Sequence, residues 1–204
     1  MLKQVFIDLM QKYSDNNIVI EKLWNEIEEN YADKKRHYHT LTHLDNLFKQ
    51  LIEVKAHIED WDTIICSLFY HDVIYNASKN DNEEKSAEMA KEKLRLLNFP
   101  EEKIAKCMLQ ILATKSHLKN TDNDTNIFTD ADLSILGCDW NMYSEYFKQV
   151  RKEYSVYPDF MYKPGRKKVL NHFLGMDRIY KTDLFYNKFE TTARQNLKRE
   201  LEEL

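Results

Sequence analysis

The stretch from Trp61 to Tyr75 reads Trp-Asp-Thr-Ile-Ile-Cys-Ser-Leu-Phe-Tyr-His-Asp-Val-Ile-Tyr. Its apolar residues recur at helical spacing, and neither Gly nor Pro interrupts it, so the pattern predicts one buried helix. On that helix His71 and Asp72 share the inward face of Leu68, because steps of three and four residues return to the same side. Burying an ionised carboxylate is costly unless it is paired or bound to a metal. The His-Asp pair therefore requires a partner from elsewhere in the chain.

The composition favours an all-α fold in one compact domain. The chain has 204 residues, of which 43% are hydrophobic, and this is enough to build a core. It contains only three Gly and three Pro, whereas a β-rich fold with many turns generally uses more of both. We expect a single all-α domain over residues 1–204, with a metal-site core at about 32–137 and C-terminal helices at 139–203 packed on it.

Charge and cysteine content argue against several classes of function. The net charge is −4 and the basic residues are spread along the chain, so no nucleic-acid polymer is expected as a partner. The three Cys lack a Cys-x-x-Cys pattern, which indicates buried thiols in a reducing compartment. No signal-peptide core or long apolar run occurs, so we expect a cytoplasmic protein without a membrane partner. The sequence leaves monomer and homodimer open.

Apolar spacing and capping residues predict the other helices. Asp81, followed three residues later by Glu84, forms a capping-box pattern that begins a helix reaching Leu97. Pro100 is expected in the first turn of the next helix. Residues 117–128 are expected to form a solvated loop, and 157–165 an ordered connection. The remaining helices are expected at about 2–13, after the break at 15–17, and at 40–58, 129–137, 139–156, 166–174 and 183–203.

Several side chains outside the stretch could meet the His-Asp pair in space. His39 and His43 lie four residues apart at the start of a predicted helix, so both can face one site. Asp132 is a carboxylate within an otherwise apolar helical segment, and His117 follows a strongly apolar helix. One divalent metal would satisfy both inward carboxylates. The predicted metal ligands are His43, His71, Asp72 and Asp132.

Imidazole and carboxylate ligands suit a divalent metal such as Mn, Fe, Co, Ni, Zn or Mg, and the pattern leaves the metal's identity and count open. Such a metal lowers the pKa of a bound water and so supplies a nucleophile near neutral pH. His39, beside the ligands, would protonate a leaving oxygen. His39 and Asp72 are thus the predicted catalytic residues. The alternative is a buried structural pair without a metal.

These residues resemble the HD superfamily of metal-dependent phosphohydrolases, whose all-α fold presents a His, a His-Asp doublet and a distant Asp from its helices. His43, His71, Asp72 and Asp132 match that pattern in order. An uncharacterised branch of predicted HD phosphohydrolases is more similar still, over about residues 24–200. The stretches that carry this likeness are 36–39 with His43, 71–75, 82–87, 113–117, 130–133, 150–154 and 165–166.

A more distant similarity is to the cyclic-nucleotide phosphodiesterases. There the first His of a His-x-x-x-His pair is the acid and the second is a ligand, which supports the roles of His39 and His43. The same similarity favours Asp132 over Asp130 as the ligand. The second His that follows the doublet in that family is missing here, so cyclic-nucleotide specificity is not implied.

The resemblance implies a compact HD-type helical bundle that cleaves a phosphate ester of a nucleotide or small phosphometabolite. Arg36 and Arg166 could grip a substrate phosphate bidentately. Glu83 could contact substrate or a second metal. His117 has two possible roles: a contact to a phosphate or second metal, or a cap at a helix C-terminus. Two other functions remain: a di-iron oxygenase that uses His117 and Glu83 as extra ligands, and a non-catalytic metal- and nucleotide-binding module.

Overall fold

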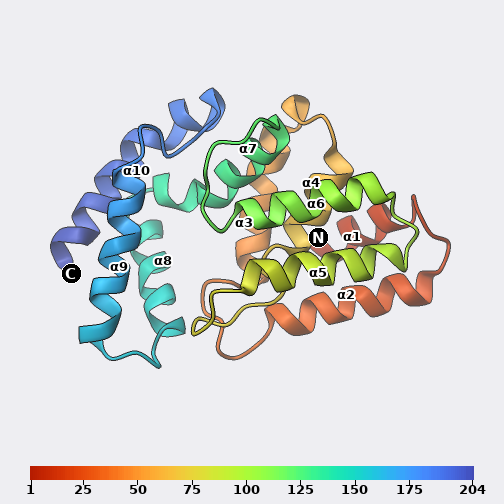
Figure 1. Ribbon diagram of the computed structural model, residues 1–204, viewed down its shortest axis with the longest axis horizontal. Coiled ribbons are helices and arrows are strands. Elements are labelled where there is room, and N and C mark those ends of the chain that lie inside the picture. Colours follow the sequence, from red (N-terminus) through yellow and green to blue (C-terminus); the bar gives the residue numbers. More distant parts are fainter.

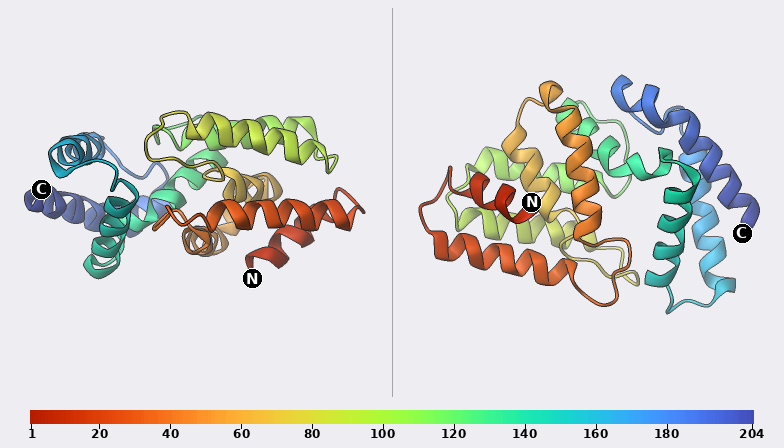
Figure 2. Two further views of the ribbon diagram at one scale, coloured as in Figure 1. Left: turned by 90° about the horizontal axis from the view of Figure 1, so that it is seen from below. Right: turned by 180° about the vertical axis from the view of Figure 1, so that it is seen from behind.

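The computed structural model describes residues 1–204, and it consists of helices without strands, which confirms the all-α class. Helices α8, α9 and α10 gather at one end of the long axis and α1 to α6 at the other, and Figures 1 and 2 agree on this. The chain passes between these groups through α7 and the 3-10 helix η2. The elements are α1 Leu2–Met10, α2 Asn17–Tyr31, α3 Leu41–Glu53, η1 Lys55–His57, α4 Trp61–Tyr70, α5 Asn82–Arg95, α6 Glu101–Ala113, α7 Asn123–Asp132, η2 Leu133–Gly137, α8 Trp140–Glu153, α9 Asp159–Leu174 and α10 Asp183–Glu203.

One hydrophobic cluster of 41 buried residues runs through the molecule, from Leu2 to Leu197. Helix α4 lies at its centre, since every residue from Thr63 to Tyr70 is buried. The predicted buried helix is therefore present as far as Tyr70. None of the helices has the length and apolar character needed to cross a bilayer.

Helix α4 ends earlier than the sequence pattern predicts. It was expected to reach Tyr75, yet His71 is its C-cap and Asp72 lies beyond it. The cause is a contact that is distant in sequence: the Arg36 guanidinium donates to the carbonyl oxygens of Asp72 (2.6 Å) and Val73 (2.8 Å). These carbonyls are satisfied outside a helix, so the chain turns directly after His71.

Two segments that were predicted to be irregular are helical. The predicted loop 117–128 contains the first half of α7, because the Asp122 side chain caps it by accepting from Thr125 N (2.8 Å). The polar residues of this turn suggested solvent exposure, but Asp124 is buried. Helix α9 likewise begins at Asp159 and continues through Pro164. The carbonyl that Pro164 leaves unpaired belongs to the exposed Phe160, so water can satisfy it.

The predicted capping box at the start of α5 is absent. Asp81 occupies the N-cap position, but its side chain forms no capping hydrogen bond. It instead pairs with Lys85 (2.9 Å), and Glu84 pairs with Lys115 at the end of α6. Ion pairs with neighbouring lysines thus replace the expected reciprocal capping.

Two close contacts fix the C-terminal helices relative to the rest of the chain. Asp130, near the end of α7, accepts hydrogen bonds from the backbone N–H groups of Lys181 and Thr182, each at 2.8 Å. Asp130 was expected at a helix N-terminus, and it instead holds the N-cap of α10. Gly137 has no room for a side chain, because a methyl group there would lie 2.9 Å from Cα of Phe189 on α10.

Candidate metal centre and its cavity

Three predicted ligands converge from three different helices. His43 lies in the first turn of α3, His71 caps the end of α4, and Asp132 ends α7. His43 Nε2 lies 3.1 Å from His71 Nε2 and 3.2 Å from Asp132 Oδ1, and His71 Nε2 lies 3.7 Å from that oxygen. Metal–ligand bonds of about 2.0–2.2 Å place adjacent ligand atoms about 3.0–3.5 Å apart. These residues therefore form a group that could hold a metal ion.

Asp72 places a second carboxylate beside this group from the turn after α4. Its Oδ2 lies 3.1 Å from His71 Nε2 and 3.9 Å from His43 Nε2. The predicted common helix face did not bring it there, because the helix has already ended. The Arg36 contacts described above shape the turn that brings Asp72 into the site. His43, His71 and Asp132 thus form the group that could hold a metal ion, and Asp72 lies next to its two imidazoles.

The tautomer of the neutral His71 ring is set by a backbone carbonyl. Its Nδ1 lies 3.0 Å from the oxygen of Leu68, which can only accept, so Nδ1 carries the hydrogen. Nε2 of the neutral ring then directs a lone pair at the position between His43 and Asp132. Fixing the imidazole tautomer through its outer nitrogen is the usual device by which proteins orient a metal-binding histidine.

The charges of the group favour a cation at its centre. Burial lowers the pKa of His71, but the neighbouring Asp72 carboxylate outweighs burial and raises it to about 9. Burial likewise raises the pKa of Asp132, yet hydrogen bonds from His117 and His43 hold it well below its usual range. The Asp72 pKa is lowered for the same reason, with His71 the largest favourable partner. Without a metal, protons on the imidazoles take the place of the positive charge.

His117 contacts this group through Asp132. Its Nε2 lies 2.9 Å from Asp132 Oδ2, so it holds the carboxylate oxygen that faces away from His43. The backbone of His117 has φ 52°, in the left-handed region that non-glycine residues rarely adopt. Such a conformation costs on the order of 1–3 kcal/mol and persists where the surroundings over-determine it. This backbone conformation directs the His117 ring towards Asp132. His117 therefore holds the predicted metal ligand Asp132 in position.

His39 stands beside the group and is held by Glu153. Its Nδ1 lies 2.7 Å from Glu153 Oε2, and its Nε2 lies 4.0 Å from Asp72 Oδ2. Glu153 Oε1 also accepts from the backbone N–H groups of residues 37 to 39, at 2.7 to 3.0 Å. The Tyr75 ring stacks on His39, and its hydroxyl donates to Glu153 Oε2 at 2.9 Å. The imidazole therefore presents Nε2 to the metal centre in a fixed orientation.

Glu153 and Tyr75 are the site residues that sequence reasoning missed. Glu153 ends α8, more than a hundred positions from His39, and a Glu on a polar-looking helix gives no local signal of burial. The stretch 150–154 did contribute to the family resemblance, which was the one available indication.

The two predicted phosphate-binding arginines have other partners. Arg36 donates to three backbone carbonyls and does not line the cavity, so the structure gives no support to its predicted contact with a phosphate. Arg166 does line the cavity, but it is buried in a bidentate pair with Glu200, at 2.7 and 2.9 Å. The Arg166 guanidinium is thus already paired with a carboxylate. Glu83 lies on the cavity wall, 3.9 Å from Lys115, and outside the group of close ligand atoms.

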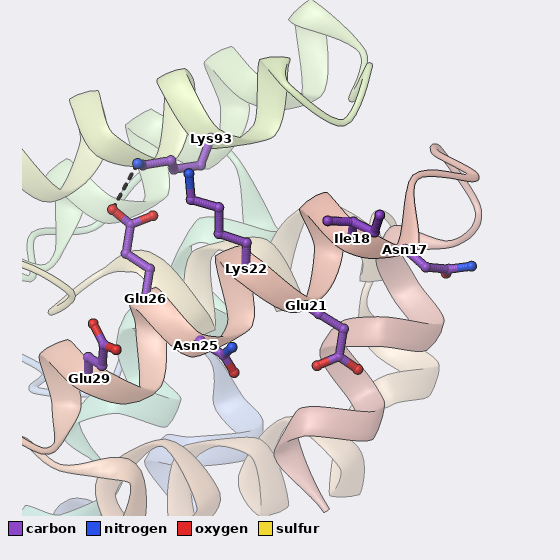
Figure 3. Close-up of a pocket in the computed structure, with 8 residues that line it drawn as sticks. All are labelled: Asn17, Ile18, Glu21, Lys22, Asn25, Glu26, Glu29 and Lys93. Atoms are coloured by element: carbon purple, nitrogen blue, oxygen red, sulfur yellow. Dashed lines mark hydrogen bonds and ion pairs between the residues drawn. The ribbon is translucent and has the colours of Figure 1, made fainter.

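The metal centre opens into a cavity of about 610 Å³, lined by His39, His43, Asp72 and Asp132 among others. Its size suits a small ligand. A larger hollow of about 850 Å³ lies along α2, beside Lys93 of α5, and Figure 3 shows its lining. Ile18 is the one hydrophobic residue there, and the Lys93–Glu26 ion pair (2.8 Å) crosses it. That hollow is a solvated surface trough, so the candidate site is the cavity at the histidines.

Comparisons of the chain with protein-family models, with curated proteins and with solved structures found no match. The functional argument therefore depends on the residues of the site.

Proposed function

We propose that this protein is a metal-dependent phosphohydrolase of the HD type, which cleaves the phosphate ester of a small molecule such as a nucleotide or phosphometabolite. One observation carries the proposal. The carboxylates of Asp72 and Asp132 are paired with imidazole nitrogens alone, and the ligand atoms of His43, His71 and Asp132 all lie within 4.8 Å of one another. A His and carboxylate set of this kind suits a divalent transition metal with open positions.

The four ligands would hold a divalent cation at the floor of the cavity. When bound, such a cation supplies a polarised water for attack on phosphorus and offsets the negative charge of the phosphoryl group. The remaining work belongs to the protein side chains. His71 keeps its lone pair on the site through Leu68, and His117 keeps Asp132 in place. Fixed groups of this kind need no reorganisation during the reaction.

His39 has the geometry of a general acid. Burial lowers its pKa, but the Asp72 and Glu153 carboxylates outweigh burial and raise it, which favours the protonated ring. With Nδ1–H donated to Glu153, the proton available to a substrate is on Nε2, which faces the metal centre. That proton would go to the departing oxygen as the phosphorus–oxygen bond breaks.

The geometry gives less support to the oxygenase alternative. A second metal would use His117 and Glu83, but His117 is bonded to Asp132 and Glu83 faces Lys115. About two irons per chain together with oxygen uptake would favour that function over hydrolysis. Tight nucleotide binding without turnover would favour the non-catalytic module.

The test is hydrolysis of a panel of phosphate monoesters and diesters by protein loaded separately with Mn, Fe, Co, Ni, Zn or Mg. His71→Ala should abolish turnover, because it removes a ligand. His172→Ala is the matched control, since His172 is an exposed histidine outside the cavity, and it should retain turnover. No hydrolysis with any metal, or equal activity in the two variants, would overturn the proposal.

A further inference from the structure

The cavity above the metal centre has two unlike walls. Of its 26 lining residues, 14 are hydrophobic, and they are not mixed evenly with the polar ones. The polar residues away from the metal lie on one side, in the loop before α5 and at the adjacent ends of α5 and α6. The opposite side is formed by α8, α9 and the turn between them. The wall that these two helices form is called the α8–α9 wall below.

The polar wall is the side suited to a phosphate. Lys79 and Lys115 both line it, and Lys79 forms no ion pair within the protein. Lys115 is shared with Glu83 and Glu84. An ammonium group without a partner beside a metal centre attracts an anionic substrate and helps to orient it.

The α8–α9 wall consists mainly of aromatic and aliphatic side chains, and its hydrogen-bonding groups are tyrosine hydroxyls and the Arg166 guanidinium. Its cavity-lining residues include Tyr146, Val150, Tyr154, Met161, Val169 and Phe173. The one charged group on it, Arg166, is neutralised by Glu200. No carboxylate or amide side chain on this wall faces the cavity to bind sugar hydroxyls or the polar edge of a base.

Two of these apolar side chains remain in water at the cavity mouth. Met161 is 52% exposed and Val169 is 44% exposed, and both line the cavity. Apolar side chains at this place offer contact area to an apolar part of a ligand in the cavity. Hydrophobic surface thus extends from beside the metal centre to the cavity mouth.

The geometry points to a specific substrate class: phosphate esters of alcohols that carry an apolar ring, with the phosphate at the metal and lysine side and the ring on the α8–α9 wall. This inference rests on the proposed phosphohydrolase function. It narrows that function, because esters of polyhydroxylated alcohols and nucleosides should be poor substrates.

The test compares three esters of primary alcohols, whose leaving groups have similar acidity: 2-phenylethyl phosphate, glycerol 1-phosphate and adenosine 5′-monophosphate. With the full-length, metal-loaded protein, kcat/KM for the phenyl ester should exceed the other two by about tenfold or more, the range that apolar pocket contacts supply. Equal values, or a preference for either of the other esters, would overturn the inference and leave the hydrolase proposal standing.

A matched pair of variants locates the preference on the α8–α9 wall. Met161→Glu places a charge on the cavity rim and should lower the preference for the phenyl ester about tenfold. Phe160→Glu is the control, because Phe160 is the neighbouring residue, is 78% exposed and does not line this cavity. It should leave the preference unchanged. An equal effect of the two variants, or no effect of Met161→Glu, would overturn the placement of the ring.

A binding measurement separates this inference from the proposed function. 3-Phenylpropylphosphonate keeps the shape of the phenyl ester and cannot be hydrolysed, and 3-hydroxypropylphosphonate lacks the ring. Calorimetry should show tighter binding of the phenyl compound, reduced by Met161→Glu, whether or not turnover occurs. Tighter phenyl binding without hydrolysis of any ester would refute the function alone, and equal binding of the two phosphonates would refute the ring wall.

Discussion

Asp130 and Asp132 lie two residues apart on α7, yet their surroundings differ completely. Asp130 accepts from two backbone N–H groups and from the Thr182 hydroxyl, at 2.7 to 2.8 Å. Asp132 faces the imidazole nitrogens of His43, His71 and His117. One carboxylate is satisfied by donors that the fold itself supplies, whereas the other is left to a cation or to protons.

Two other buried carboxylates resemble Asp130. Asp124 accepts from Glu59 N and Asp60 N, and Glu190 accepts from Ile179 N and Tyr180 N. Such carboxylates tie loops to helices. Asp72 resembles Asp132, because the ion pairs of its carboxylate are with histidine nitrogens only. Burial alone therefore does not mark a functional carboxylate in this protein. The type of hydrogen-bond donor that faces the carboxylate is what distinguishes a functional one.

The sharpest test of the division is activity. Asp132→Asn or Asp72→Asn should lower kcat/KM for phosphate ester hydrolysis by more than about a hundredfold, since losing a residue that merely orients a metal ligand costs ten- to a hundredfold. Asp124→Asn should retain turnover in the folded fraction. A ligand variant as active as Asp124→Asn would break the comparison.

Thermal or denaturant unfolding separates the two neighbours on α7. In chelator, Asp130→Asn should lower the free energy of unfolding by about 1–3 kcal/mol, because an amide places a donor against the N–H groups before α10. Adding metal at about 100 times its Kd should stabilise wild type and Asp130→Asn by about 2.7 kcal/mol. Asp132→Asn should show no such gain. Equal stabilisation of the two variants would contradict the division.

Glu153 belongs to the loop-holding carboxylates and also serves the site. Glu153→Gln should lower kcat about tenfold or more with little change in KM, because His39 loses its orienting partner and its raised pKa. In a profile of kcat against pH, the fall in activity at high pH should occur at a lower pH than in wild type, because His39 loses its proton at a lower pH. An unchanged kcat and profile would remove Glu153 from the mechanism.

The same variant has a defined effect on stability. Burial raises the pKa of Glu153, but the His39 bond and charge outweigh it and lower the pKa from its usual 4.5 to about 2. A depressed pKa contributes stability that is present above pH 4.5 and lost as pH falls to about 2. Glu153→Gln should therefore flatten the loss of stability over that interval. A slope equal to wild type would contradict the pairing.

The smallest effect expected concerns His117. His117→Gly relieves the left-handed backbone and should leave stability unchanged or raise it by up to about 1 kcal/mol, while metal affinity falls about tenfold. His117→Asn tolerates the same backbone and is the control for the ring. Metal affinity equal to wild type in both variants would show that the Asp132 contact has no role.

The sequence predicted the fold class and the residues of the site better than their local structure. Apolar spacing located α4 and α10, and the helix predicted at 183–203 has those bounds. The end of α4 could not be predicted, because Arg36, from a loop far upstream, captures the carbonyls that follow it. The helix predicted at 129–137 begins earlier, at Asn123, and its first turns were missed because polar side chains there, such as Asp124, are buried by distant partners.

For the site, three of the four predicted ligands, His43, His71 and Asp132, form one group that could hold a metal ion, and Asp72 lies beside it. Glu153 was not predicted, because it accepts from the backbone N–H groups of residues 37 to 39. Nearly every residue has such a group, so the sequence gives no sign of these contacts. The partners of Arg36 and Arg166 could not be predicted for a related reason. Their acceptors are carbonyls and a carboxylate that only the folded chain brings near.

Metal content per chain, measured side by side for wild type, Asp130→Asn and Asp132→Asn after reconstitution, tests the central claim most directly. The account predicts about one divalent transition metal in wild type and in Asp130→Asn, and none retained by Asp132→Asn, because only Asp132 lacks donors from the fold. No metal in wild type, or equal content in the two variants, would contradict it. The histidines and their carboxylates would then be a buried ion-pair cluster.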